Sequence, residues 1–438
     1  MNTPICDFVR DYAAGNPVRL HMPGHKGVPL LGCEAWDITE IDGADNLYAP
    51  GGIIAESEAN AGALFGCRTF YSAEGSSLGI RAMLRVMMQI TGDRTVLAQR
   101  SVHKAFLYAA ALLDLDVRWL QPHTADTYYS GVVTAQDVET ALQTVRPAAV
   151  YLTSPDYLGN SPDVAAIARV CRRHGVLLLV DNAHGAYLHF LPQPLHPMDL
   201  GADMCCDSAH KTLPVLTGGA YLHLSEELQI PDEQVKEALA LFGSTSPSYL
   251  ILQSLDRVNV YLETYRERLA AFLPQVDALR QALTRQGFTL RGSDPLRITI
   301  RARDYGCTGD ALASALLRSG IVCEMHDPAY LVLMLTPENT PQDLQRTREA
   351  FAAVVRKEPL PDDAPAYHAL PQAMRVREAM FAPQEMLHTS ACVGRVMASA
   401  AVNCPPAVPI VLCGERMDSE AVARLCYYGV HHCAVVVE

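Results

Sequence analysis

A lysine and an aspartate in the middle of the chain have the surroundings of a two-residue catalytic site. Lys211 lies among side chains that form hydrogen bonds, in the stretch Asp207-Ser208-Ala209-His210-Lys211-Thr212-Leu213-Pro214. Upstream, the apolar run at 176–180 ends in Asp181, which is typical of a strand buried on both faces. An acid at the carboxyl end of such a strand faces the crevice where open α/β sheets bind ligands. Pyridoxal 5'-phosphate (PLP) needs this pair, because a lysine holds its aldehyde and an acid pairs with its ring nitrogen.

A candidate anion site lies upstream, where Gly75, Ser76 and Ser77 open a predicted helix. The helix is predicted because Leu78 and Ala82 begin an apolar repeat of every four residues. Backbone N–H groups, the positive end of the helix dipole and the two hydroxyls would converge there on a phosphate. Serine is also an ordinary helix cap. Each motif alone therefore fits a structural role as well, as a solvated loop lysine or a capping aspartate would.

The composition indicates a globular protein without a nucleic-acid surface. The chain has 438 residues, 49% of them apolar and 19% charged, enough for about two or three domains. Its net charge of −13 argues against nucleic acid, and no apolar run approaches the roughly 18 residues of a membrane span. The beginning of the sequence lacks the pattern of a signal peptide. The 13 cysteines include no C-x-x-C pair, so we expect no structural metal site and a reducing, cytoplasmic environment.

Strands and helices alternate through the first two thirds of the chain. We expect strands at 95–98, 148–152, 176–180 and 219–224, and helices at 54–65, 103–115 and 164–173, which together predict a mostly parallel sheet covered on both faces. The candidate site residues fall at strand ends, which places them on one side of the sheet. They are Gly75 to Ser77, His103, Ser154, Asp181 and Lys211.

The rest of the chain predicts smaller domains. A long helix from 250 to about 286 suits a hinge. Beyond it we expect a half-buried strand at 296–301, strands at 321–325 and 330–335, and helices at 309–318 and 341–355. The expected domains are a loop-rich segment at 1–45, a large PLP-binding domain at 46–285, a small α/β domain at 286–358 and a C-terminal domain at 366–438.

Several motifs together resemble the Orn/Lys/Arg decarboxylase family of fold-type-I (aspartate aminotransferase-like) PLP enzymes, in a short form without an N-terminal wing domain. Besides the stretches around Gly75 and Lys211, the resemblance rests on Met22-Pro23-Gly24-His25-Lys26-Gly27, Arg100-Ser101-Val102-His103-Lys104, Asp181-Asn182-Ala183-His184-Gly185, Ser244-Thr245-Ser246-Pro247-Ser248-Tyr249 and Pro405-Pro406-Ala407-Val408-Pro409 with Gly414-Glu415.

The resemblance implies a role for each candidate residue. Lys211 would bind the cofactor covalently, Asp181 would pair with the ring nitrogen, with Ala183 or His184 nearby, and His103 would stack on the ring. Gly75, Ser76 and Ser77 would cradle the phosphate with Ser208 and His210, and Ser246 or Thr245 would reach the phosphate of a neighbouring subunit. Lys211 and His210 are both candidates for returning a proton to the substrate carbon.

The implied reaction is decarboxylation of arginine, lysine or ornithine to an amine, a step of polyamine biosynthesis, in a homodimer or higher homo-oligomer with shared active sites. Glu415 and Asp156 are candidate partners for the distal cation of the substrate. An aminotransferase on the same fold and a non-enzymatic regulator remain alternatives. Glu74, Asn182 and Gly218 depart from the family pattern, which usually has an asparagine, a glutamate and an amide there.

Overall fold

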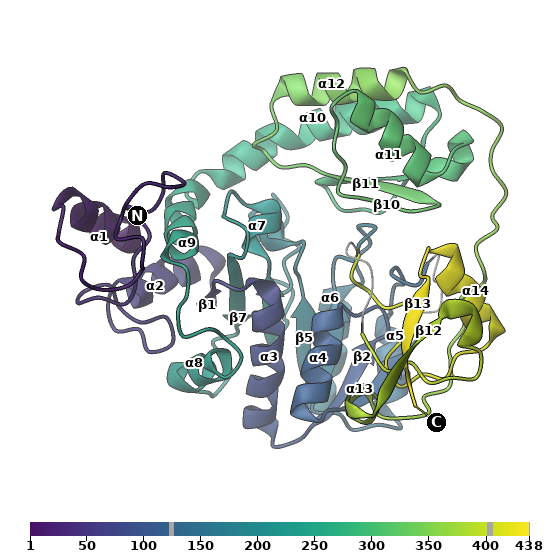
Figure 1. The fold of residues 1–438 in the computed structure, drawn as a ribbon, viewed down its shortest axis with the longest axis horizontal. Coiled ribbons are helices and arrows are strands. Elements are labelled where there is room, and N and C mark those ends of the chain that lie inside the picture. Colours follow the sequence, from purple (N-terminus) through teal and green to yellow (C-terminus); the bar gives the residue numbers. More distant parts are fainter. Residues whose placement is uncertain (122–126, 401–405, 438) are drawn as a thin grey trace. The chain divides into compact units, whose positions relative to one another are not determined.

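The structure is a computed structural model that describes residues 1–121, 127–400 and 406–437. The chain forms two compact units (Figure 1). The first comprises Met1–Asp93, Ala148–Ser154 and Val164–Leu269, and the second comprises Arg94–Pro147, Pro155–Asp163 and Ala270–Glu438. Within the described residues, no helix has the length and apolarity needed to cross a membrane.

The first unit is built on a sheet of buried strands. Their order is β1 (Arg68–Ser72), β7 (Ala220–Leu224), β6 (Met204–Asp207), β5 (Leu177–Asp181) and β4 (Ala149–Thr153). Strands β4, β5 and β6 are parallel to one another, whereas β7 runs antiparallel to both of its neighbours. The predicted strands lie within one residue of the observed ones, and the expectation of a mostly parallel arrangement is confirmed.

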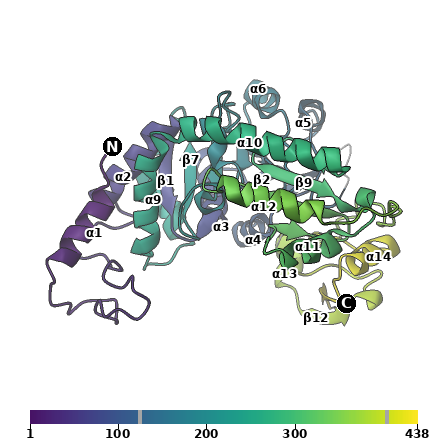
Figure 2. The same ribbon diagram turned by 90° about the horizontal axis from the view of Figure 1, so that it is seen from above.

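Helices cover both faces of this sheet. Figure 2 shows α3 (Gly75–Thr91) and α6 (Val164–His174) on opposite sides of it. The predicted apolar face of α3 is buried, including Leu78 and Ala82. Gly79 allows α3 to approach the sheet closely, because a Cβ there would lie 3.0 Å from Cys206 Sγ.

The strand register brings several strand ends to one edge of the sheet. Thr153 pairs with Asp181, Asp181 with Cys206, and Asp207 with Tyr221. Ser72, at the end of β1, pairs with Ala220, at the start of β7. The segments that follow β1, β4, β5 and β6 therefore all leave the sheet at this edge.

The remaining helices of the first unit include one that was not expected. These are α1 (Pro4–Ala14), α2 (Ile53–Phe65), η1 (Ala186–Phe190), α7 (Ala209–Thr212), α8 (Asp232–Ala240) and α9 (Tyr249–Leu262). Within the segment 1–45, which was expected to be rich in loops, the structure has the helix α1. Proline is favoured in the first helical turn, and Ile5 and Val9 are buried where α1 packs against α2 and α9.

The second unit contains three groups of strands. The parallel pair β2 (Thr95–Gln99) and β3 (Asp116–Leu120) is connected by α4 (Lys104–Leu113). An antiparallel sheet has the order β10 (Met325–His326), β11 (Tyr330–Met334), β9 (Arg297–Arg301) and β8 (Thr289–Arg291), and β12 (Gln384–His388) pairs with β13 (His432–Val436). Its other helices are α5 (Ala135–Leu142), η2 (Ala302–Tyr305), α11 (Gly309–Arg318), α12 (Pro341–Ala352), α13 (Val376–Phe381), η3 (Thr389–Ala391) and α14 (Ser419–Tyr427).

Three predictions about the chain from residue 250 onward were wrong. The long helix from 250 is divided into α9 and α10 (Tyr265–Gln286), because Glu263 and Thr264 donate to carbonyls three residues back and end the first helix. Of the strand expected at 321–325, only Met325 belongs to a strand, which is β10. Strand β9 is buried at four of its five residues rather than half-buried. Burial of its polar residues is compatible with Thr299 Oγ1 donating to the carbonyl of Leu158 at 2.8 Å.

Candidate active site

Lys211 lies directly beyond the edge where β6 ends. The short helix α7 carries it, and its Nζ lies 2.8 Å from Nε2 of His184. His184 belongs to the turn that follows β5. An ammonium group only donates hydrogen bonds, so Nε2 is the acceptor whenever Lys211 is charged. The structure therefore brings together two of the predicted residues that come from neighbouring strand ends.

Asp181 closes β5 and is 2% exposed. Its Oδ1 accepts from the backbone N–H of Ala183 at 3.2 Å, and the hydroxyl of Tyr151 donates to Oδ2 at 3.4 Å. Burial raises the pKa of Asp181 to about 6, and the nearby charge of Lys211 opposes this rise. A carboxyl group with such a pKa can share a proton with a basic nitrogen near neutral pH.

The start of α3 has the features expected of an anion cradle. Gly75 has a positive φ of 72°, and its N–H donates to the carbonyl of Gly218 at 2.7 Å. Ser208 Oγ donates to Ser76 Oγ at 2.8 Å, which joins the cradle to the segment that carries Lys211. Glu74, the residue whose charge would repel a phosphate, accepts from the backbone N–H of Ser244 at 2.5 Å.

The remaining predicted residues have separate surroundings. His210 Nδ1 donates to the carbonyl of Gly219 at 2.9 Å, and burial lowers the pKa of His210. Ser246 is exposed, and the N–H of Ser154 donates to the carbonyl of Asp181 at 3.0 Å. His103 belongs to the second unit and caps α4, where its Nδ1 accepts from Ala105 N–H at 3.1 Å. The roles of these residues stay predictions.

The two acids proposed for the substrate cation already have protein partners. In the second unit, Glu415 Oε2 lies 3.2 Å from Arg100 Nη2, and both side chains are buried. Asp156 accepts from Ser130 Oγ at 2.7 Å and from Asn160. These contacts give both acids a structural role. Pro405, the first residue of the stretch Pro405-Pro406-Ala407-Val408-Pro409, lies outside the described residues.

Sequence reasoning missed a cluster of buried polar side chains next to the edge of the sheet where β5 and β6 end. Asp207, the last residue of β6, accepts hydrogen bonds from His196, His223 and Asn182. Asp207 and Asn182 were visible as residues at strand ends, next to the residues that were selected. Neither histidine gave a signal, because each is isolated in an apolar part of the sequence.

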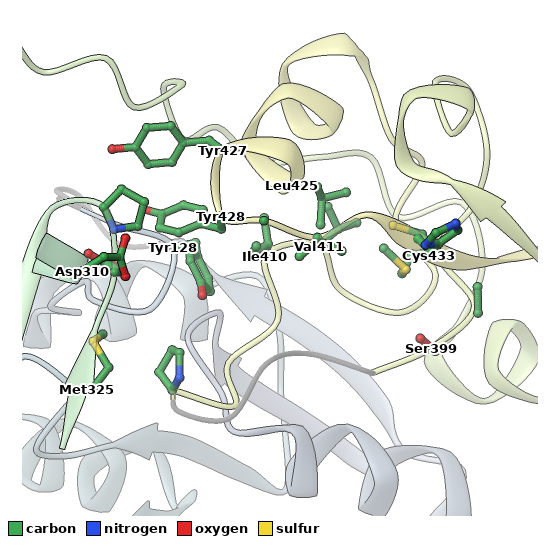
Figure 3. Close-up of a pocket in the computed structure, with 18 of the residues that line it drawn as sticks. Tyr128, Asp310, Met325, Ser399, Ile410, Val411, Leu425, Tyr427, Tyr428 and Cys433 are labelled. Atoms are coloured by element: carbon green, nitrogen blue, oxygen red, sulfur yellow. The ribbon is translucent and has the colours of Figure 1, made fainter. Parts of the chain in front are cut away.

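A cavity of about 560 Å³ in the second unit is lined by none of the predicted site residues. Figure 3 shows Tyr128, Tyr427 and Tyr428 near Asp310 at one end of the view. Met325, Ile410 and other apolar side chains complete much of the lining. The predicted lysine chemistry does not belong to this cavity.

Comparison with known proteins identifies the family of this chain. The family model of the Orn/Lys/Arg decarboxylase major domain matches residues 3–293. The chain is 31% identical to the uncharacterized protein YaaO of Bacillus subtilis (strain 168), covering 97% of this chain and 94% of the relative. It is 28% identical to an arginine decarboxylase of the same organism, covering 97% and 93%.

A solved structure confirms the predicted fold class. The lysine decarboxylase LdcF of Francisella novicida aligns with a TM-score of 0.82 over 99% of this chain and 81% of that one, at 15% sequence identity. At this identity the likeness supports the fold alone, whereas the family match covers more than half of the chain and includes the stretches around Gly75, Asp181 and Lys211. The chain belongs to the Orn/Lys/Arg decarboxylase family.

Proposed function

We propose that this decarboxylase uses PLP to remove CO₂ from a basic L-amino acid. The observation that carries the proposal is the position of Lys211, whose amine lies 2.8 Å from His184. Its charge also lies close enough to the buried Asp181 to oppose the rise that burial causes in the pKa of that acid. When bound, PLP supplies an electron sink for the substrate carbon that loses CO₂.

The residues present fit this cofactor. Gly75 begins the 17-residue helix α3, and no side chain or backbone atom would lie within 4 Å of a Cβ at that position. Ser76 and Ser208 place two hydroxyls beside this helix start. A phosphate there would gain from the helix dipole and from the hydroxyl donors. Lys211 would hold the cofactor, and Asp181 would face its ring nitrogen.

The hydrogen bonds of the two candidate proton donors favour Lys211. Because a carbonyl only accepts, His210 uses its Nδ1 proton in the bond to Gly219. Burial lowers the pKa of His210, so its Nε2 carries no proton at neutral pH. Lys211, bonded to His184, is therefore the group that we propose returns a proton to the substrate carbon.

Arginine is the substrate that we would test first. The relative at 28% identity is named arginine decarboxylase, and an acidic chain of net charge −13 suits a cationic amino acid. Lysine and ornithine carry a compact ammonium instead of a planar guanidinium, so all three substrates need to be compared.

We also propose that two copies of the chain associate. The segment 18–36 of the first unit exposes seven large apolar side chains, and Leu20 and Leu31 are each 90% exposed. A run of exposed apolar side chains of this kind is typical of a protein–protein interaction site. Ser246 is exposed in the same unit. The family resemblance implies that this residue reaches the phosphate site of the neighbouring subunit.

The decisive experiment gives purified protein PLP with arginine, lysine or ornithine in turn, and measures CO₂ and the amine formed. We expect one substrate to be converted by the wild type and by Lys357→Ala, a variant at an exposed lysine, but not by Lys211→Ala. When a 2-oxo acid is supplied as well, its consumption without release of CO₂ would show an aminotransferase. Binding of PLP without turnover of any of the three amino acids would favour the regulator.

A further inference from the structure

At the end of β6, the fully buried carboxylate of Asp207 accepts three hydrogen bonds. Asp207 Oδ2 accepts from His196 Nε2 at 2.9 Å and from His223 Nε2 at 3.2 Å, and Oδ1 accepts from Asn182 Nδ2 at 2.6 Å. The side chains of Asp207 and both histidines have no exposed surface. Burial alone would raise the pKa of Asp207, but the two imidazoles outweigh it and hold the pKa below its ordinary value. Asp207 is therefore an anion in the protein interior.

The hydrogen bonds around the histidines fit this anion better than a metal ion. The backbone N–H of Met198 points at His196 Nδ1 at 3.3 Å, so Nδ1 is the unprotonated nitrogen and Nε2 carries the proton given to Asp207. A metal bound at Nε2 would need the opposite tautomer. For His223, Nδ1 lies 2.9 Å from Thr69 Oγ1, whose hydroxyl also donates to the carbonyl of Cys67 at 3.4 Å, and burial lowers the pKa of His223.

Asp207 lies on the opposite face of the sheet from Asp181. Side chains alternate along a strand, and Asp181 pairs in register with Cys206 rather than with Asp207. Cys206 faces helix α3, since a Cβ at Gly79 would lie 3.0 Å from its Sγ. Asp207 therefore does not share the face of the sheet that carries Asp181, and any influence on the site passes through its neighbours.

Asn182 provides that connection. Its amide is wedged between Asp207 and Gly185, where an added Cβ would lie only 2.0 Å from Asn182 Oδ1. Gly185 has an ordinary negative φ of −123°, so it is needed for space rather than for conformation. The N–H of Gly185 donates to the carbonyl of Asn182 at 2.8 Å and closes the turn. This turn carries His184, which contacts Lys211.

We infer that Asp207 is a positioning residue of the catalytic site: held by His196 and His223, it fixes Asn182, and through the turn at 182–185 it sets the position of His184 against Lys211. The inference deepens the proposed function, because that function gives Lys211 its role. It also accounts for Asn182, a departure from the family pattern. In the described part of the structure Asn182 Oδ1 is buried without a hydrogen-bond partner, so only the Nδ2 end of its amide is held.

The test exchanges the carboxylate and the amide between the two strands. In Asp207→Asn, the new amide N–H group faces the amide N–H group of Asn182. The hydrogen bond from Asn182 Nδ2 to the charged carboxylate is therefore lost. The double variant Asp207→Asn with Asn182→Asp restores a donor and an acceptor at that contact and keeps an acceptor for both histidines. The matched control is Asp256→Asn, another buried aspartate of the first unit, which accepts from Cys6 N–H and Ser57 Oγ.

Two measurements read the position of Lys211. One is the affinity of the full-length protein for PLP, and the other is the rate at which acetic anhydride labels Lys211 in the cofactor-free protein, followed by peptide mass spectrometry relative to Lys357. We expect Asp207→Asn to weaken PLP binding about tenfold, the effect of losing one charge-assisted hydrogen bond, and to change the labelling rate several-fold. The double variant should recover both, and Asp256→Asn should change neither.

The inference is overturned if Asp207→Asn leaves the labelling of Lys211 unchanged, if Asp256→Asn alters it equally, or if the folded double variant recovers nothing. One zinc ion per chain in the purified wild type, lost in Asp207→Asn, would also overturn it. Because labelling needs neither cofactor nor substrate, failure of the proposed function would show separately, as wild-type protein that neither binds PLP nor releases CO₂.

Discussion

Replacing Asp181 by asparagine is expected to stabilise the cofactor-free protein while it impairs the cofactor site. Burial raises the pKa of Asp181 from 3.8 to about 6, which corresponds to a cost of about 3 kcal/mol for the ionised group at ~1.4 kcal/mol per pH unit. Because the folded-state pKa is the higher one, the stability associated with the protonated form is complete below pH 3.8 and is lost as the pH rises through 6. Asp181→Asn keeps the acceptor for Ala183 N–H but never ionises.

The assay is urea unfolding of cofactor-free wild type and Asp181→Asn at pH 5, 6.5 and 8, at one protein concentration so that association does not confound the comparison. We expect the variant to be more stable by about 2–3 kcal/mol at pH 8, with a smaller advantage at pH 5. With PLP present the order should reverse, because the asparagine cannot hold a protonated ring nitrogen. A less stable variant at pH 8, or an equal difference at pH 5 and pH 8, would refute the reasoning.

Two further substitutions test other buried contacts of the first unit. Gly185→Ala places a Cβ 2.0 Å from Asn182 Oδ1 and should lower the melting temperature and the affinity for PLP together; unchanged PLP affinity in the folded variant would contradict the packing argument. Lys236→Met removes the cation that lies 2.5 Å from the buried Glu58 and should cost about 3–5 kcal/mol at pH 8 in urea unfolding. Since burial raises the pKa of Glu58, this loss should shrink at lower pH, and adding Glu58→Gln should restore much of the stability; a loss independent of pH would count against the explanation.

The first unit could be predicted closely because its elements have strong local signals. Strand β5 is a continuous apolar run, and such runs are typical of parallel strands covered on both faces. Asp181, which ends this strand, was selected because an acid at the carboxyl end of a buried strand faces the ligand-binding crevice of the sheet. Lys211 was also expected at a strand end, and it follows β6.

The second unit was predicted less well because its strands are short and irregular. Only Met325 of the expected strand at 321–325 pairs in a strand, as the first residue of β10. Strand β9 alternates apolar and polar residues, yet Arg297 and Thr299 are buried because each contacts a carbonyl oxygen from a segment far away in the sequence. An alternating apolar and polar pattern predicts exposed polar side chains only when these side chains have no hydrogen-bond partners inside the protein. Partners that are distant in the sequence cannot be predicted from it.

The Asp207 cluster was unpredictable for a different reason, which is strand register. The sequence gives the alternation of side chains within β5 and within β6, but it does not say which residues of the two strands pair. Because Asp181 pairs with Cys206, Asp181 and Asp207 point to opposite faces; a shift of one residue would bring both acids to the same face. Two carboxylates there would compete for Lys211, and the charge of one would raise the pKa of the other. The observed register separates them, so that one acid faces the side with Lys211 and the other anchors the turn at 182–185 from behind.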